Sequence, residues 1–163
     1  MAIKGVNLAQ THRFVSSRDP DKGNEGAETV FVLKTLDSFQ HAFLQDQMMG
    51  FEQQAGSGSQ DAKVRMGHVS LLHFRMAVVE VQNFLHPVTN MPIELTKTNK
   101  NYAGKSYPVA DDDFIALVPE DIMQEAYMFM QDKNQVSAGE AKKSDTQSSP
   151  SNSSQNGTAQ AAA

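Results

Sequence analysis

The sequence contains no cysteine and no tryptophan, and the absence of cysteine narrows the classes of protein that it can encode. Without cysteine a chain has no disulfide framework, no thiolate metal site and no cysteine nucleophile. Disulfide-stabilised secreted proteins, cysteine-ligated zinc proteins and thiol redox proteins are therefore excluded. This composition favours a protein that works in a reducing compartment.

Long apolar runs are also missing. No segment approaches the ~20 consecutive apolar residues that a membrane-spanning helix needs. The first residues, Met1–Asn7, lack the apolar stretch that is typical of a signal peptide. We therefore expect no membrane association and a cytoplasmic location.

Positive charge is scarce, with 14 Lys and Arg against 19 Asp and Glu and a net charge of −5. Affinity for nucleic acid comes mainly from Lys and Arg at phosphate groups, so this balance disfavours a nucleic-acid partner. One local exception interleaves positive charge with aromatic rings, as single-strand binding surfaces do: Lys97, Lys100, Tyr102, Lys105 and Tyr107. We prefer to interpret it as an exposed hairpin with solvated lysines.

What the chain has is methionine and phenylalanine, nine of each among 163 residues. Flexible thioether side chains repack easily, so such residues form either an ordinary core or an adaptable binding surface. The core is the simpler interpretation. As the candidate partner-binding set we select Phe39, Phe43, Met48, Met49, Met128 and Met130.

The composition changes along the chain and predicts three segments. Residues 1–28 are rich in turn-forming residues and predict an irregular N-terminal arm, with a short ordered piece at Leu8–Val15. Residues 29–132 predict one small globular α+β domain with a few short antiparallel strands and about three helices. Residues 133–163 are dominated by Ser, Gln, Asn, Lys and Ala and predict a disordered polar tail.

The first half of the predicted domain begins with a strand at Thr29–Lys34, which is rich in β-branched and aromatic residues. Asp37 or Ser38 is placed to cap a helix over Phe39–Met49. A loop with three glycines, 50–58, follows and is expected to be flexible.

The second half opens with apolar residues at helical spacing between Val64 and Phe84. The β-branched residues near Val78 leave a turn to strand open, but we expect helix throughout. Pro87, Asn90 and Pro92 then break the pattern. A short strand at Ile93–Thr96 is expected to pair with Ser106–Val109, which makes Lys97–Lys105 a hairpin loop.

Two capping signals mark the end of the domain. The three acidic residues Asp111–Asp113 are placed to cap a short turn of helix, and Pro119 starts another helix. The buried face of that last helix should consist of Ile122, Ala126, Phe129 and Met130.

No motif carries recognisable chemistry. Asp111–Asp113 lack the alternating ligands of a calcium loop, so capping explains them better than metal binding. The Gly104-Lys105-Ser106 sequence ends like a phosphate loop, but Asn99 stands where that loop needs its first glycine. His68 and His73 lie about 140° apart on a helix, too far for a shared metal. We expect no catalysis, no cofactor and no metal.

One pattern resembles a known group. The order of Thr29–Ser38, Val69–Val81, Asn83-Phe84, Asn90–Ile93 and Asp112–Met130 is similar to small structural-module proteins of tailed bacteriophages, particularly the tail assembly chaperones. In that group a strand and a Leu-Asp-Ser-like helix start precede a long apolar helix, a proline-containing loop and a closing acidic helix. Gln82 and Asn90 replace an aromatic residue and a glycine of the usual pattern.

The resemblance implies a protein that binds other phage structural proteins in the host cytoplasm, with the tape-measure protein as one client. The leading hypothesis is a tail assembly chaperone or assembly factor. The first alternative is a minor virion protein of the head or of a head–tail or tail junction. A small nucleic-acid-binding regulator is the third, and homo-oligomerisation stays open.

Overall fold

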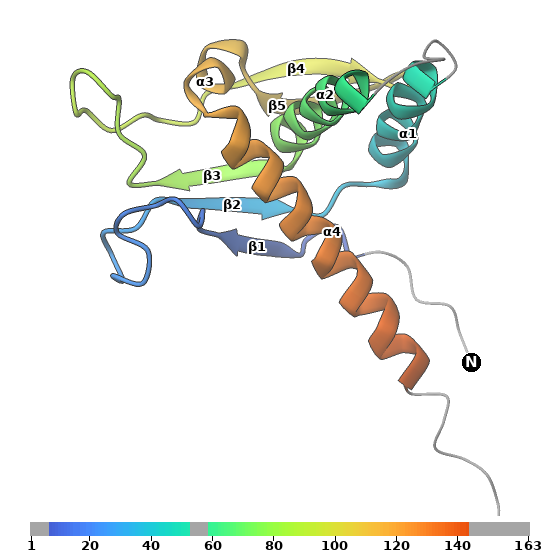
Figure 1. The fold of residues 1–163 in the computed structure, drawn as a ribbon, viewed down its shortest axis with the longest axis horizontal. Coiled ribbons are helices and arrows are strands. Elements are labelled where there is room, and N and C mark those ends of the chain that lie inside the picture. Colours follow the sequence, from blue (N-terminus) through green and yellow to red (C-terminus); the bar gives the residue numbers. More distant parts are fainter. Residues whose placement is uncertain (1–6, 53–58, 144–163) are drawn as a thin grey trace, which may run out of the picture. The chain divides into compact units, whose positions relative to one another are not determined.

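The structure, a computed structural model, describes residues 7–52 and 59–143, with side chains for 7–48 and 66–134. The chain divides into two compact units, 1–131 and 132–163. The described residues form four helices and five strands, the strands in two small antiparallel sheets (Figure 1). The predicted small α+β domain with antiparallel strands is therefore confirmed, with one helix more than the three expected.

The larger sheet contains β1 (Thr11–Phe14), β2 (Val30–Lys34) and β3 (Val78–Gln82), in that spatial order. Both pairings are antiparallel, and β2 lies at the centre. The predicted strand at Thr29–Lys34 is confirmed as β2. β1 lies within the short ordered piece, Leu8–Val15, that is expected in the otherwise irregular N-terminal arm. Phe14 is buried there, and its ring packs against Phe31.

Helix α1 (Ser38–Glu52) begins where the sequence predicts it. The Gln40 amide donates to the Asp37 carboxylate at 2.9 Å, and the Asp37 amide donates to the Gln40 side-chain oxygen at 3.1 Å. This reciprocal pair satisfies two backbone donors at the helix start. The helix continues past Gly50, and residues 53–58 of the expected flexible loop lie outside the described residues.

Helix α2 (Ser59–Ala77) ends earlier than predicted and continues directly into β3. The expectation of a helix through Phe84 is wrong from Val78 onward. Three valines among Val78–Val81 lose side-chain freedom in a helix but fit a pleated sheet, and pairing with β2 decides in favour of the strand.

The second sheet is a hairpin of β4 (Lys97–Tyr102) and β5 (Lys105–Ala110). The expected partner of β5, Ile93–Thr96, is not a strand, and most of the expected loop is β4 instead. Ala103 and Gly104 form the two-residue turn with φ angles of 48° and 76°. Positive φ at both positions matches the twist of a hairpin, so a polar sequence of low β-propensity still pairs.

Two helices complete the domain. α3 (Asp112–Leu117) is capped by Asp111, whose carboxylate accepts from the Phe114 amide at 2.8 Å, as predicted. α4 (Glu120–Lys143) follows Pro119 and buries Ala126 and Met130. It extends into the segment expected to form a disordered tail, and residues 144–163 lie outside the described residues.

The core lies between the larger sheet and the helices, and aromatic rings connect its parts. The Phe31 ring centroid lies 5.4 Å from that of Phe74 and 5.5 Å from that of Phe84. Phe84 in turn lies 6.1 Å from Phe114. Strand β2, helix α2, the chain after β3 and helix α3 therefore share one apolar core.

Candidate partner-binding surface

The loop between β3 and β4 projects from the domain (Figure 1), and its first residue is clamped at the base. Asn83 adopts a φ of 55°, and its side-chain amide donates to the carbonyls of Gly26 and Glu28 at 3.0 and 3.1 Å. The Thr29 hydroxyl donates to the Asn83 carbonyl at 3.1 Å. Phe84, the next residue, enters the core, so the loop leaves the domain from a fixed point.

Hydrogen bonds also hold the outer part of this loop. Leu85 and Pro92 form an antiparallel bridge, and the His86 amide donates to the Met91 carbonyl at 2.9 Å. The Asn90 amide donates to the His86 carbonyl at 2.9 Å, with Asn90 at a φ of 53°. His86 Nδ1 accepts from the Val88 amide at 3.2 Å. The loop therefore has a defined shape of its own.

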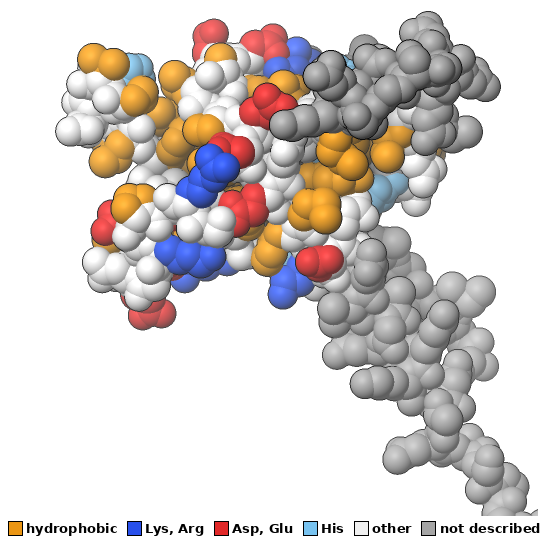
Figure 2. Space-filling view, viewed as in Figure 1, with side chains coloured by type: hydrophobic (Ala, Val, Ile, Leu, Met, Phe, Trp, Pro, Cys, Tyr) orange, Lys and Arg blue, Asp and Glu red, His pale blue; other side chains and the backbone are white. Residues whose placement is uncertain are grey.

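Three apolar side chains project from this ordered loop. Leu85 is 48% exposed, Val88 85% and Met91 65%, and we call these three residues the apolar tip. Figure 2 shows hydrophobic side chains gathered on the projecting loop, at the upper left of the view. A pre-ordered apolar surface loses little conformational entropy when it binds, which favours association with another apolar surface.

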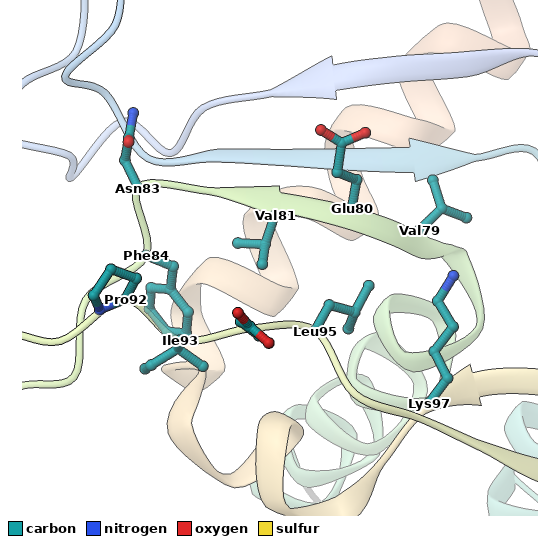
Figure 3. A pocket seen from close by; sticks show the side chains of 10 residues that line it. Val79, Glu80, Val81, Asn83, Phe84, Pro92, Ile93, Leu95 and Lys97 are labelled. Atoms are coloured by element: carbon teal, nitrogen blue, oxygen red, sulfur yellow. The ribbon is translucent and has the colours of Figure 1, made fainter.

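A groove begins at the base of the same loop, between β3 and the chain that leads into β4. The two chains are joined where the Ile93 amide donates to the Phe84 carbonyl at 2.8 Å, and they diverge beyond that point. The space between them measures about 400 Å³. In Figure 3, Val81 on β3 and Leu95 on the facing chain point into it.

The charges of the groove are unevenly placed. Glu80 and Glu94 are exposed side chains that line it, and no ion pair involving either is found among the described residues. Lys97 lines the end nearest the start of β3. Burial, and to a smaller extent the charge of Lys97, hold the pKa of Lys34 below its ordinary value.

The six residues selected from the sequence do not form one surface. Met130 is 1% exposed and belongs to the core, whereas Met128 is 56% exposed. Two residues apart on a helix are about 200° apart, so these methionines occupy opposite sides of α4. The selection of Met130 as a binding residue is therefore contradicted by its burial.

The other candidates lie on α1. Phe39 is exposed with the Lys105 ammonium 5.3 Å from its ring, and Met48 is partly exposed. Phe43 is half-buried against the Tyr102 ring at 4.8 Å. The side chain of Met49 lies outside the described residues.

The interleaved lysines and tyrosines of the hairpin do not form a stacking surface. Tyr102 and Tyr107 are 5% and 7% exposed, so neither ring face is available to a base. Lys100 donates to Asp112 at 3.0 Å, and the Lys105 ammonium lies 3.7 Å from the Asp37 carboxylate. These contacts partly neutralise the charge that would attract phosphate.

Asp37 connects this hairpin to α1. The Tyr107 hydroxyl donates to its carboxylate at 2.8 Å, and burial together with this hydrogen bond raises the pKa of Tyr107 to about 12. Burial would raise the pKa of Asp37, but the hydrogen bonds from Gln40 and Tyr107 outweigh it and the pKa is lowered. This constellation is structural, because its groups already satisfy one another.

The other titratable groups singled out in the sequence lie apart. Among the described residues there is no group of three or more His, Asp or Glu that could hold a metal. His73 is buried in α2, and His68 is exposed on the same helix. None of the helices in the described part of the chain combines the length and apolar character of a bilayer span.

The apolar tip and the groove are the features that sequence reasoning missed. Leu85, Val88 and Met91 stand between turn-forming residues. Apolar residues in such a segment could have indicated an exposed apolar loop. Nothing in the sequence indicated the groove, because the pattern after Ala77 predicted a helix and not the edge strand that forms one wall of it. Its existence depends on β3 being an edge strand.

Comparisons with protein-family models, with curated proteins and with solved structures found no match.

Proposed function

We propose that this protein is an assembly factor of a tailed bacteriophage that binds other phage structural proteins, and that it acts as a tail assembly chaperone. The single observation that carries the proposal is the apolar tip. Three exposed apolar side chains on a hydrogen-bonded loop are costly in water and become favourable when a partner covers them.

The residues that carry the family resemblance also shape this loop. Asn83 fixes its base, Phe84 anchors it in the core and Asn90 makes its turn. A glycine is the usual residue where Asn90 stands, and asparagine is the next most tolerant of a positive φ. The departure from the family pattern therefore preserves the turn.

A client with an apolar, helical surface suits this tip, and the tape-measure protein is the client that the resemblance implies. The alternative role, a minor virion protein, would use the same tip in a permanent contact. The regulator hypothesis is weaker, because the rings that would stack on bases are buried.

The proposal is tested by complementation of a phage that lacks the gene. The variant carries Val88→Ser and Met91→Ser, and Leu8→Ser is the matched control because Leu8 is also exposed, at 53%. We expect both to keep the wild-type melting temperature, since exposed substitutions change stability little.

The tip variant should lower the yield of tailed particles by about tenfold or more, the equivalent of roughly 1.4 kcal/mol of client affinity. The control should restore the full yield. A normal yield with the folded tip variant would overturn the proposed role of the loop.

A further inference from the structure

We propose, on the basis of the function proposed above, that the groove between β3 and residues 92–97 receives an extended segment of the partner protein, which adds as a strand to the outer edge of β3. The segment carries a basic side chain between apolar ones. The groove thus specifies an extended backbone and a basic residue in the partner, whereas the apolar tip specifies only an apolar surface.

The first step is the open edge. The sheet order β1-β2-β3 leaves β3 paired on one side only within the described residues. Backbone donors and acceptors on the outer side of an edge strand form a template for another strand.

The second step is the lining of the groove. Its apolar walls are Val81, Phe84, Ile93 and Leu95, all partly exposed and all packed against the core on their inner sides. A strand presents alternate side chains to opposite faces, so one set from an added strand can enter these walls. Apolar residues of moderate size fit this lining.

The third step is charge. Glu80 and Glu94 line the groove without an ion-pair partner among the described residues, and Lys97 lines its end. In Figure 3 the Glu80 side chain points toward the β2 side of β3, so its carboxylate lies at the rim of the groove. The Glu80 carboxylate accepts a hydrogen bond from the neutral side-chain amide of Gln82 at 2.7 Å. A charge on an edge strand normally discourages unwanted pairing. A lysine or arginine between the apolar residues of the incoming strand pairs with the negative charge. Strands without a basic residue are then disfavoured, and a strand that carries one is selected.

The probe is a synthetic peptide of alternating valine and threonine with one central lysine. Binding is measured by NMR titration of the full-length, ¹⁵N-labelled protein. We expect chemical shifts to move at the amides of Val79, Glu80 and Val81. Shifts confined to the apolar tip or to α1 would overturn the proposed site.

Charge selectivity is tested by exchange on both sides. The same peptide with a central glutamate should bind about tenfold more weakly to the wild type. It should regain affinity for the Glu80→Lys, Glu94→Lys variant, which should in turn bind the lysine peptide weakly. Equal affinity of both peptides for both proteins would contradict the charge argument.

Backbone pairing is tested with the lysine peptide N-methylated at alternate residues along one edge, made in two versions. The version methylated on the edge that faces β3 should lose binding by about tenfold or more, because it cannot donate to the strand. Undiminished binding of both versions would show that side chains alone hold the peptide.

Peptide binding and the particle-assembly test together distinguish the strand-addition proposal from the proposed assembly function. If the lysine peptide fails to bind while the apolar tip variant still blocks particle formation, strand addition is wrong and the assembly function stands. If the peptide binds as expected but loss of the protein leaves particle assembly normal, the groove is a real site and the assembly function is wrong.

Discussion

Acidification is predicted to destabilise the domain through one buried histidine. His73 is 1% exposed, its Nδ1 has no hydrogen-bond partner among the described residues, and its ring packs edge-on against Tyr127 at 5.2 Å. Burial, with a smaller effect of the nearby His41, lowers the pKa of His73 from 6.5 to about 4. The neutral ring is therefore the form that the folded state accommodates.

The sign of the effect follows from proton binding. Between pH 6.5 and about 4 the unfolded chain binds a proton at this histidine and the folded chain does not. Stability is therefore fully present above pH 6.5 and falls as the pH falls. The shift corresponds to a maximum loss of about 3 kcal/mol, of which about 2 kcal/mol is lost between roughly pH 7.5 and roughly pH 5.

The assay is urea unfolding at those two pH values, for the wild type and for His73→Leu. The variant should lose most of the pH dependence, because a neutral side chain of similar size replaces the titrating group. His41→Gln is the matched control, since the pKa of His41 is also lowered by burial, although that ring is only half-buried. Equal pH dependence in the wild type and His73→Leu would refute the reasoning.

Four further substitutions test the described structure by thermal or urea unfolding. Tyr107→Phe removes the hydrogen bond to Asp37 and should cost about 1–2 kcal/mol; an unchanged stability would deny that this contact matters. Ala103→Asn should stabilise the hairpin by about 0.5–1 kcal/mol, because Ala103 has a φ of 48°, and a loss of stability would contradict the turn assignment. Phe74→Ala should cost about 3–5 kcal/mol, whereas Phe39→Ala, at an exposed ring, should cost far less; similar losses would contradict the assigned core.

Local signals in the sequence predicted the parts of the fold that depend on local physics. The strand β2, a cap of α1 at Asp37 or Ser38 and a cap of α3 within Asp111–Asp113 were expected where the structure has them. Of the expected face of α4, Ala126 and Met130 are buried, and the buried Met123 was not expected. In each case a capping side chain or a hydrophobic period acts within a few residues. Such signals require no knowledge of the rest of the chain.

The errors arose where a distant partner decides the structure. Val78–Val81 fit the end of a helix by spacing, and only β2, far away in sequence, makes them a strand. The polar strand β4 has weak β-propensity, and the turn at Ala103 and Gly104 creates it. The groove lies along β3, which the sequence pattern assigned to a helix. No local pattern could therefore have revealed the groove.

The measurement that tests the central claim most directly is quantitative mass spectrometry of purified phage particles and of the infected-cell lysate. The assembly-factor account predicts that the protein is abundant in the lysate and absent from finished particles. A fixed copy number in the particles, at a multiple that matches a symmetric ring, would contradict a transient role and make the protein a structural component.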